Sequence, residues 1–275
     1  MSRRGAVRAW VGGREEGRWR RCSSRRRGIA RGVAARRHRG GGRRRTTRRA
    51  RGFVRMRPDA CIIGRPSGWD GVTMGYKGVV AGAGSRPCAQ RARRRRPATM
   101  STRGGARVLG AVDTFNAGRE GAFERVQARI LGAGTTSDGV EERAWIEGGF
   151  RIPVDVTPED VRTLTHRAAG GAVEVTQHGG ERAVRSDRND PVVRALAGGV
   201  RGEGGHPRVK VKTGTADFNV VAPVWRCPIA AYGPGDSSLD HTADEHLVLE
   251  EYLRSIRVLV RAIEALATEL TGGAA

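Results

Sequence analysis

The side chain best suited to chemistry in this chain is a single histidine near the carboxyl end, His241. It lies in a loop rich in glycine and acid, with Asp236 and Asp240 before it and Asp244 and Glu245 after it. A neutral imidazole is a common metal ligand, and nearby oxygen acceptors fix its tautomer and orientation. The loop therefore predicts a metal ligand at His241. A surface histidine or a helix cap is the alternative interpretation.

Two segments around this histidine resemble a known family. They read KTGTADFNVVAPVW at residues 212–225 and YGPGDSSLDHTADEH at residues 232–246. Both resemble the co-catalytic zinc amidohydrolases that include acetylornithine deacetylase and succinyl-diaminopimelate desuccinylase, and within that superfamily the [LysW]-lysine/ornithine hydrolases. The resemblance is good from about residue 190 onward, loose over 105–185, and returns in an island near 58–80.

The resemblance implies a zinc-dependent hydrolase of a linear amide bond that releases lysine or ornithine from an acylated or carrier-protein-bound precursor. It implies two zinc (or cobalt) ions per site, with His241 as the last ligand. It also implies that the preceding turn contacts the substrate, although a structural turn explains the same residues equally well. The substrate-binding candidates are Lys212, Thr213, Gly214, Thr215, Asp217, Asn219 and Gly235.

The island at residues 58–80 predicts a strand, a turn at Gly64 to Pro66 and a second strand. Its Gly-Arg-Pro-Ser sequence resembles the Gly-Glu-Pro-Ser of the family, in which the glutamate is a zinc ligand. Arg65 occupies that position here. Because a guanidinium is always protonated and has no lone pair to give a metal, the ligand is lost and its charge is reversed. An ordinary strand pair with a surface arginine is the alternative.

The other parts of a two-metal centre are hard to find. In the family a bridging aspartate holds both cations and a glutamate activates the water between them, since two cations lower the pKa of water and stabilise an oxyanion. The family's His-x-Asp signature does not occur in the sequence. Glu15 and Glu16, the only acidic residues in 1–57, are weak candidates for the catalytic and ligand glutamates. We therefore expect impaired hydrolysis, and a catalytically dead chain that only dimerises is an alternative.

The charge of the chain is divided unequally along its length. Residues 1–100 hold 30 of the 51 Lys and Arg but only 4 of the 28 Asp and Glu, so the formal net charge of +23 comes from the amino-terminal part. Such an Arg-rich segment with few aliphatic residues buries too little apolar surface to offset its ordering entropy. We therefore expect most of residues 1–57 to be disordered.

Three explanations are open for this Arg-rich arm. Nucleic-acid binding lacks support, because aromatic interleaving and known DNA-binding patterns are missing. A transit peptide lacks support, because the segment has no amphipathic apolar face. We favour the hypothesis that residues 1–57 and 83–103 derive from an out-of-frame reading of a GC-rich gene, because misread GC-rich codons yield Arg, Gly, Ala and Pro.

The elements between residues 105 and 185 predict a compact α+β unit. Apolar spacing predicts a helix within 108–131, and loose alternation predicts a strand over 143–156. Thr157-Pro158-Glu159-Asp160 predicts a capped helix start, and Gly170 predicts its end. Short strands are predicted at 172–176 and 182–184. The resemblance implies that this unit is a lid or dimerisation domain, an antiparallel sheet backed by two helices, through which the chain forms a homodimer.

From Asp190 onward the pattern predicts α/β structure. A short helix begins at the Asp190 cap and ends at Gly198-Gly199, strands are predicted at 208–212 and 228–232, and a long amphipathic helix runs from Leu249 to Gly272. Two polar loops follow the carboxyl ends of the two strands, where open α/β sheets bind ligands.

The expected fold class is α/β: an incomplete zinc-aminopeptidase-like catalytic domain with an inserted ferredoxin-like α+β lid. The expected domains are the Arg-rich arm 1–57, a catalytic island 58–81, an Arg-rich linker 82–104, the lid 105–185 and the rest of the catalytic domain 186–275. No run of 18 apolar residues predicts a membrane span, and the four cysteines form no CxxC pair. We expect a cytoplasmic protein.

Overall fold

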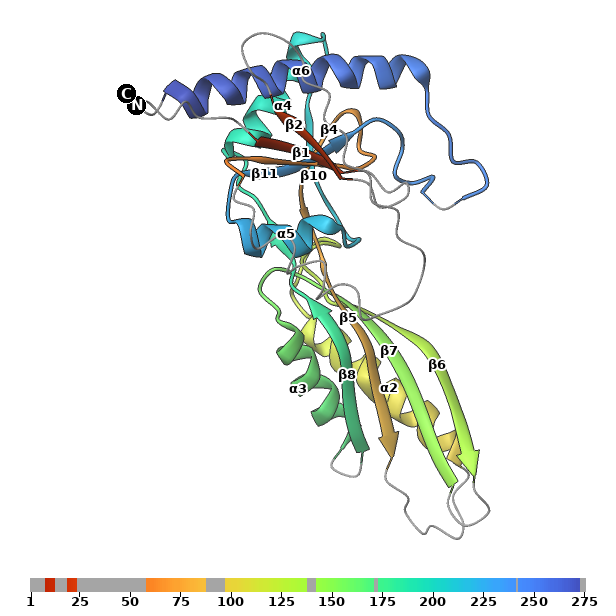
Figure 1. The fold of residues 1–275 in the computed structure, drawn as a ribbon. Coiled ribbons are helices and arrows are strands. Elements are labelled where there is room, and N and C mark those ends of the chain that lie inside the picture. Colours follow the sequence, from red (N-terminus) through yellow and green to blue (C-terminus); the bar gives the residue numbers. More distant parts are fainter. Residues whose placement is uncertain are drawn as a thin grey trace. The chain divides into compact units, whose positions relative to one another are not determined.

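A computed structural model describes residues 8–12, 19–23, 58–87, 97–137, 142–170, 173–240 and 242–272 (Figure 1). The chain divides into two compact units. Unit 1 comprises Met1–Gly75, Arg185–Val211 and Ala216–Ala275, and unit 2 comprises Tyr76–Val184 and Lys212–Thr215. The carboxyl-terminal half of the chain therefore crosses from one unit to the other more than once.

Unit 1 is built on a mixed sheet of short strands. These are β3 (Cys61–Gly64), β4 (Gly68–Tyr76), β9 (Val184–Arg185), β10 (Arg208–Lys212) and β11 (Ile229–Gly233). The strand order is β10-β4-β11-β3, and β9 pairs with β4. Strand β11 runs parallel to β3 and antiparallel to β4, so β3 and β11 bring their carboxyl ends to the same edge of the sheet.

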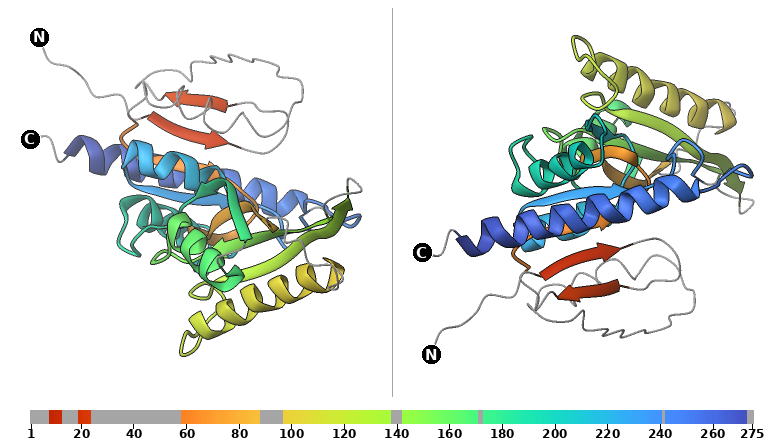
Figure 2. Two further views of the ribbon diagram at one scale, coloured as in Figure 1. Left: turned by 90° about the horizontal axis from the view of Figure 1, so that it is seen from below. Right: turned by 90° about the horizontal axis from the view of Figure 1, so that it is seen from above.

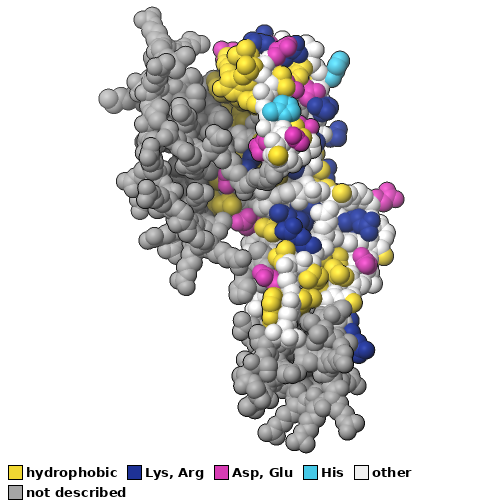
Figure 3. All heavy atoms as spheres, turned by 90° about the vertical axis from the view of Figure 1, so that its right-hand side faces the viewer, with side chains coloured by type: hydrophobic (Ala, Val, Ile, Leu, Met, Phe, Trp, Pro, Cys, Tyr) yellow, Lys and Arg dark blue, Asp and Glu magenta, His cyan; other side chains and the backbone are white. Residues whose placement is uncertain are grey.

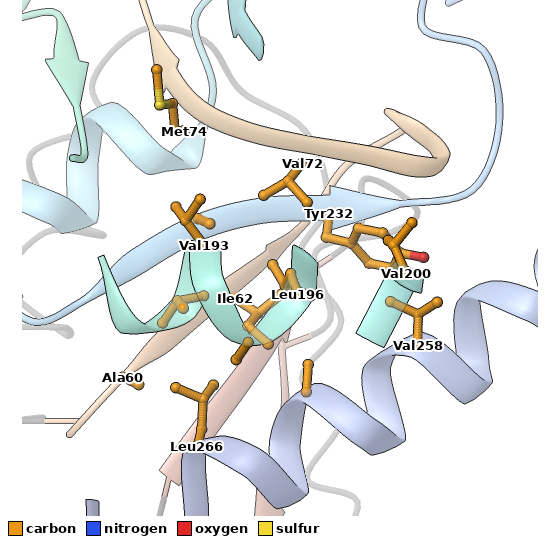
Figure 4. Close-up of a cluster of buried hydrophobic side chains, with 14 residues drawn as sticks. Ala60, Ile62, Val72, Met74, Val193, Leu196, Val200, Tyr232, Val258 and Leu266 are labelled. Atoms are coloured by element: carbon orange, nitrogen blue, oxygen red, sulfur yellow. The ribbon is translucent and has the colours of Figure 1, made fainter. Parts of the chain in front are cut away.

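Three helices belong to unit 1: α4 (Pro191–Gly202), α5 (Asp217–Trp225) and α6 (Leu249–Gly272). The right-hand view of Figure 2 shows α6 in front of the sheet of its unit. The core lies between the sheet and helices α4 and α6, with Ile62, Leu196, Tyr232 and Leu266 at its centre (Figure 4). Helix α4 approaches α6 closely at Gly199, where an added Cβ would lie 2.7 Å from the carbonyl oxygen of Val258.

Unit 2 is a four-stranded antiparallel sheet covered by two helices (Figure 1). Its elements in chain order are β5 (Gly78–Pro87), α2 (Pro97–Phe115), β6 (Gln127–Ser137), β7 (Glu142–Ile152), α3 (Pro158–Ala169) and β8 (Val173–Glu181). The strand order is β6-β7-β5-β8. Val80, Phe150 and Ile152 of the sheet pack with Val112 of α2 and Val161 of α3. This is the antiparallel sheet backed by two helices that the family resemblance implies.

The start of α3 confirms the prediction made from its local sequence. The backbone N–H of Asp160 donates to the Thr157 hydroxyl at 3.1 Å, and the N–H of Thr157 donates to the Asp160 carboxylate at 2.8 Å. This reciprocal pair satisfies two of the N–H groups that a helix start leaves unpaired. Gly170 ends the helix with φ +82°, as its residue type predicts.

The helix predicted within residues 108–131 is partly wrong. Helix α2 begins earlier, at Pro97, and ends at Phe115, and residues 127–131 lie in β6. Gly118 and Gly121 stand between the two elements with φ of +75° and +77°. Left-handed glycines at these positions end the helix and let the chain enter a strand. Helix α4 also differs slightly, because it continues past Gly198-Gly199 to Gly202.

Two short parts of the Arg-rich arm form strands. Within residues 1–57, β1 (Arg8–Gly12) and β2 (Trp19–Ser23) form a two-stranded antiparallel ladder, and disorder over most of this arm stays a prediction. The rest of that arm lies outside the described residues. The expected linker 82–104 contains the end of β5 and the start of α2. Among the described residues, no helix is both long and apolar enough to cross a membrane.

Candidate functional site

Arg65 occupies the position at which the resemblance implies a lost metal ligand, and it lies directly after β3. Its backbone N–H donates to the carbonyl oxygen of Tyr232 at 3.2 Å, which ties it to the carboxyl end of β11. An added Cβ on Gly233 would lie 2.8 Å from the Arg65 carbonyl oxygen, so only glycine fits at that point of β11. The parallel pairing of β3 and β11 therefore places Arg65 at the sheet edge where α/β folds bind ligands.

The Arg65 side chain forms an ion pair with Asp217, the first residue of α5. Its Nη2 lies 3.6 Å from Asp217 Oδ2, and the two side chains are 17% and 44% exposed. The structure thus brings together two residues that the sequence analysis identified separately. At this distance and exposure the attraction is weak, because solvent screens it.

The described residues of unit 1 do not fit a two-zinc centre. The ligand position carries a guanidinium, which repels a cation, and its carboxylate neighbour Asp217 is already paired with it. No group of three or more His, Cys, Asp or Glu side chains in the described part of the chain is placed to hold a metal ion. His241, Glu15 and Glu16 lie outside the described residues, so the structure does not place them.

Two further candidates in unit 1 have structural roles. Asn219 is buried, and its Oδ1 accepts from the N–H of Ala216 at 3.0 Å, which closes the first turn of α5. Gly235 has φ +90°, a conformation that favours glycine, and its carbonyl accepts from the N–H of Gly68 at 2.8 Å. Asn219 therefore positions the turn that carries Asp217, and Gly235 shapes the loop after β11.

The remaining candidates, Lys212 to Thr215, belong to unit 2. The carbonyl of Lys212 accepts from the backbone N–H of Lys77 at 3.1 Å. Thr213 and Gly214 are exposed, and an added Cβ on Gly214 would meet no atom within 4 Å. The local structure therefore does not require glycine at position 214.

Thr215 links two cationic residues that the sequence analysis did not select. Its hydroxyl donates to the Lys77 carbonyl at 3.1 Å and accepts from Nη1 of Arg151, which lies in β7. Burial lowers the pKa of Arg151, and the neighbouring charge of Arg129 lowers it further, while Glu181 raises it. Arg151 is partly buried, whereas Arg129 is exposed, and the positive charge of both guanidinium groups favours an anion beside Arg151.

Lys77 anchors this part of unit 2 from inside. Its side chain is fully buried, and Nζ donates to the carbonyl of Ala122 at 2.8 Å and to the carbonyl of Arg125. Burial lowers the pKa of Lys77 to about 8, Glu124 opposes that shift, and Arg151 adds to it. The ammonium therefore fastens the turn between α2 and β6 to the start of β5.

A signal for Arg151 and Lys77 was present in the sequence. Arg151 stands between the apolar residues Phe150 and Ile152 of β7, and Lys77 stands between two short runs without charge, 74–76 and 78–81. A cation inside a buried strand pattern calls for a partner, because an unpaired charge is costly to bury. The partners are distant in sequence, so only the fold identifies them.

Comparison with known proteins gives consistent matches. The model of peptidase family M20/M25/M40 matches residues 2–265, so it extends over the Arg-rich arm, which the resemblance seen in the sequence did not cover. A [LysW]-lysine hydrolase of Deinococcus radiodurans is 41% identical over 232 residues, covering 79% of this chain and 61% of the relative. A putative [LysW]-lysine/[LysW]-ornithine hydrolase of Thermococcus kodakarensis is 35% identical over 210 residues, covering 76% and 56%.

Solved structures share the fold at low identity. The M20 family metallo-carboxypeptidase Sso-CP2 of Sulfolobus solfataricus has a TM-score of 0.60 at 15% identity, covering 81% of this chain and 67% of that one. The di-peptidase Dug1p of Saccharomyces cerevisiae has a TM-score of 0.57 at 10% identity, covering 76% and 59%. This chain spans less than two thirds of the length of the two curated relatives named above.

Proposed function

We propose that this chain, which belongs to peptidase family M20/M25/M40, recognises lysine or ornithine linked to a carrier protein but hydrolyses that link poorly. The activities for which its relatives are named support the substrate class. The observation that carries the proposal is the contrast between two cationic residues. Arg151 in unit 2 is held by Thr215 and suits an anion, whereas Arg65 in unit 1 occupies the place of a metal ligand.

Arg151 is suited to bind the carboxylate of the amino acid. A guanidinium presents five N–H donors in a planar fork that matches a carboxylate with two parallel hydrogen bonds. The Thr215 hydroxyl holds one edge of the fork, and the charge of Arg129 adds to the local positive potential. Both lysine and ornithine carry an α-carboxylate, so this site selects for the part that the two products share.

Arg65 explains why we expect weak hydrolysis. Cleavage of an amide requires an activated water and stabilisation of the oxyanion, which two cations supply in the family. The described residues around Arg65 do not fit such cations, so we assign no step through a metal to this chain. Residues of unit 2 bind the substrate: Arg151 holds a carboxylate, and Lys77 fixes the turn between α2 and β6.

Turnover by the full chain tests the proposal directly. We expect little or no release of lysine or ornithine from a carrier protein, with or without added zinc or cobalt, under conditions where the Deinococcus radiodurans relative is active. Release abolished both by a chelator and by His241→Ala would contradict impaired hydrolysis and would support His241 as a ligand.

Ligand binding tests the recognition half separately. Calorimetric titration of the full chain with lysine, ornithine and their N-acyl forms should give binding that weakens about tenfold or more in Arg151→Met, because a charge-assisted pair is removed. Arg162→Met is the matched control, since Arg162 is an exposed arginine of unit 2 paired only on the surface of α3. Equal binding by both variants would contradict the role of Arg151.

Reversal of the charge at position 65 tests the lost ligand. We expect Arg65→Glu to retain more zinc than the unaltered chain after dialysis, because it places a second carboxylate beside Asp217. Adding His241→Ala should reduce that gain if His241 completes the site. Unchanged zinc content in Arg65→Glu would contradict the assignment of this position.

A homodimer through residues 105–185 is the second part of the proposal. Strand β6 stands at one end of the strand order of unit 2 and exposes Ile130 and Leu131, 41% and 45% exposed. An apolar edge strand of this kind favours pairing with another chain.

Nucleic-acid binding through the Arg-rich arm remains a prediction about residues that lie mostly outside the described ones. Deletion of 1–57 with filter binding at rising salt would test it.

A further inference from the structure

We propose that the exposed apolar stripe on the first half of α6 is a self-association surface that packs against the same stripe of a second copy, with the two helices antiparallel. The stripe consists of Leu249, Leu253, Ile256 and Val260, whose exposed fractions are 75%, 54%, 40% and 50%. This surface lies in unit 1 and is distinct from the dimer expected through residues 105–185. It is independent of the proposed hydrolase activity.

Helix α6 has two apolar faces, and only one of them is used within the described part of unit 1. The inner face buries Ser255, Val258, Ala262 and Leu266 to 1% exposure or less. The members of the stripe follow one another at spacings of four, three and four residues, so they form one row along the helix. Because all four side chains are exposed, this row lies on the outer side of α6. Helix α6 therefore packs on unit 1 through its inner face, and the stripe takes no part in that packing.

The stripe is part of a larger apolar surface. Leu247, Val248 and Tyr252 are 44%, 49% and 45% exposed beside it. Figure 3 shows hydrophobic side chains gathered in the upper part of the described surface, at the level of α6. A contiguous apolar patch of this kind marks an interaction site more often than single exposed aliphatic residues do.

The spacing of the stripe makes it complementary to itself. The intervals of four, three and four read the same in both directions. When two such helices pack antiparallel, Leu249 of one copy faces Val260 of the other, and Leu253 faces Ile256. Each apolar side chain then meets an apolar side chain, as a two-fold interface requires.

The charges beside the stripe agree with the antiparallel arrangement. Glu250 and Arg257 lie two helical turns apart on the same side of the stripe, with side chains 73% and 53% exposed. Within the chain, Glu250 pairs with Arg254 at 2.8 Å and Arg257 pairs with Glu203 at 2.6 Å. Ion pairs near the surface contribute little, so they do not prevent a further contact across the helix pair. A two-fold axis across the helix pair brings Glu250 of one copy to within about two residues of Arg257 of the other, and the reverse. A parallel pair would instead place like charges at the same level.

The size of the stripe predicts weak association. The stripe covers twelve residues of helix, Leu249 to Val260, which span about 18 Å. A stable interface buries roughly 800 Å² on each partner. One helix pair of this length covers less than that. The second copy is therefore expected to bind at high protein concentration and to dissociate on dilution.

Sedimentation velocity of the full chain over a wide concentration range tests the proposal. We expect the mean mass to rise with concentration, and the apparent dissociation constant to increase about tenfold or more in Leu253→Glu and in Ile256→Glu, because each variant places an unpaired carboxylate in the apolar contact. Thr268→Glu is the control, since it adds the same charge at an exposed position of α6 outside the stripe.

The possible results are distinct. A fall in mass for both stripe variants and none for the control supports the proposal. A mass unchanged by the stripe variants places self-association elsewhere, such as in residues 105–185, and overturns it. A wild-type chain that stays monomeric, with a cysteine introduced by Leu253→Cys resisting thiol labelling, would show that the chain covers its own stripe and would also overturn it. Circular dichroism checks that the exposed substitutions leave the fold intact.

Discussion

Units 1 and 2 each contain a cationic side chain with a distinct role, and the two side chains differ in burial and in their partners. In unit 2, Lys77 is fully buried, and its ammonium donates to two backbone carbonyls. In unit 1, Arg65 is partly exposed, and its ion pair with Asp217 spans 3.6 Å. The first cation is built into the packing of its unit, whereas the second stands at the edge of a sheet whose core is complete without it.

This difference indicates what each residue contributes. Removal of a partner from a buried polar group leaves an unsatisfied group and costs much, whereas removal of a partly exposed charge costs little. A residue at the edge of the sheet can therefore be replaced without loss of the fold. Arg65 in the place of a ligand glutamate is consistent with such a replacement, whereas replacement of the buried Lys77 would destabilise unit 2.

The largest expected effect is the loss of Lys77. Lys77→Met should lower the free energy of unfolding by about 3 kcal/mol, because two buried carbonyls lose their donor. Chemical unfolding measures the loss, and hydrogen exchange should localise it to the turn between α2 and β6. The exposed variant Arg162→Met provides the baseline. A loss below that of the control would mean that the hydrogen bonds of Lys77 add nothing to unit 2.

The pH dependence of stability sharpens the same point. The folded-state pKa of Lys77 is about 8, against an ordinary value of 10.5. Between these values the unfolded chain binds more protons than the folded chain, so this group makes the free energy of unfolding rise with pH, and below pH 8 the penalty for the buried cation is complete.

Urea unfolding of the unaltered chain and of Lys77→Met at several pH values isolates this contribution. The difference between the two free energies should grow in favour of the unaltered chain from pH 8 upward. A difference that is constant with pH would indicate that burial does not shift this amine.

A smaller effect is expected at the cap of α3. Thr157→Ala should cost about 1 kcal/mol, because one N–H of the first turn loses its acceptor. Thr163→Ala, an exposed substitution inside the same helix, is the matched control and should be neutral or slightly stabilising. Thermal unfolding distinguishes them, and equal midpoints would show that the cap contributes little.

The smallest effect is expected at Arg65. Arg65→Met should change the free energy of unfolding by about 0.5 kcal/mol or less, because the pair with Asp217 is long and partly solvated. A loss as large as that of Lys77→Met would erase the contrast between the units and would make Arg65 a structural residue.

Much of the fold could be predicted where its cause is local. Strands β10 and β11 were predicted to within a residue, and the start and end of α3 follow from Thr157, Pro158 and Gly170. Helix α5 was not predicted, because Pro223 and the β-branched residues near it disguise its period. The strand that follows α2 was mistaken for helix because its first residues continue a helical spacing.

The candidate site was predictable only in part. Arg65 and Asp217 were identified one at a time, but their pairing depends on a helix and a strand that are 152 positions apart in the chain. Arg151 and Lys77 were missed, since their common partner Thr215 comes from a distant segment. The role of His241 stays a prediction, because that residue lies outside the described ones.

The amino-acid sequence alone specifies the cap of α3, the strands β10 and β11 and the period of α6, because these depend on residues a few positions apart. It also specifies that α6 is a long amphipathic helix. Only the tertiary structure could reveal that the small face with Ser255 and Ala262 is buried and the face with Leu249 and Leu253 is exposed. Burial depends on which distant elements pack against the helix. The helical period shows which residues share a face, but it does not show which face is buried.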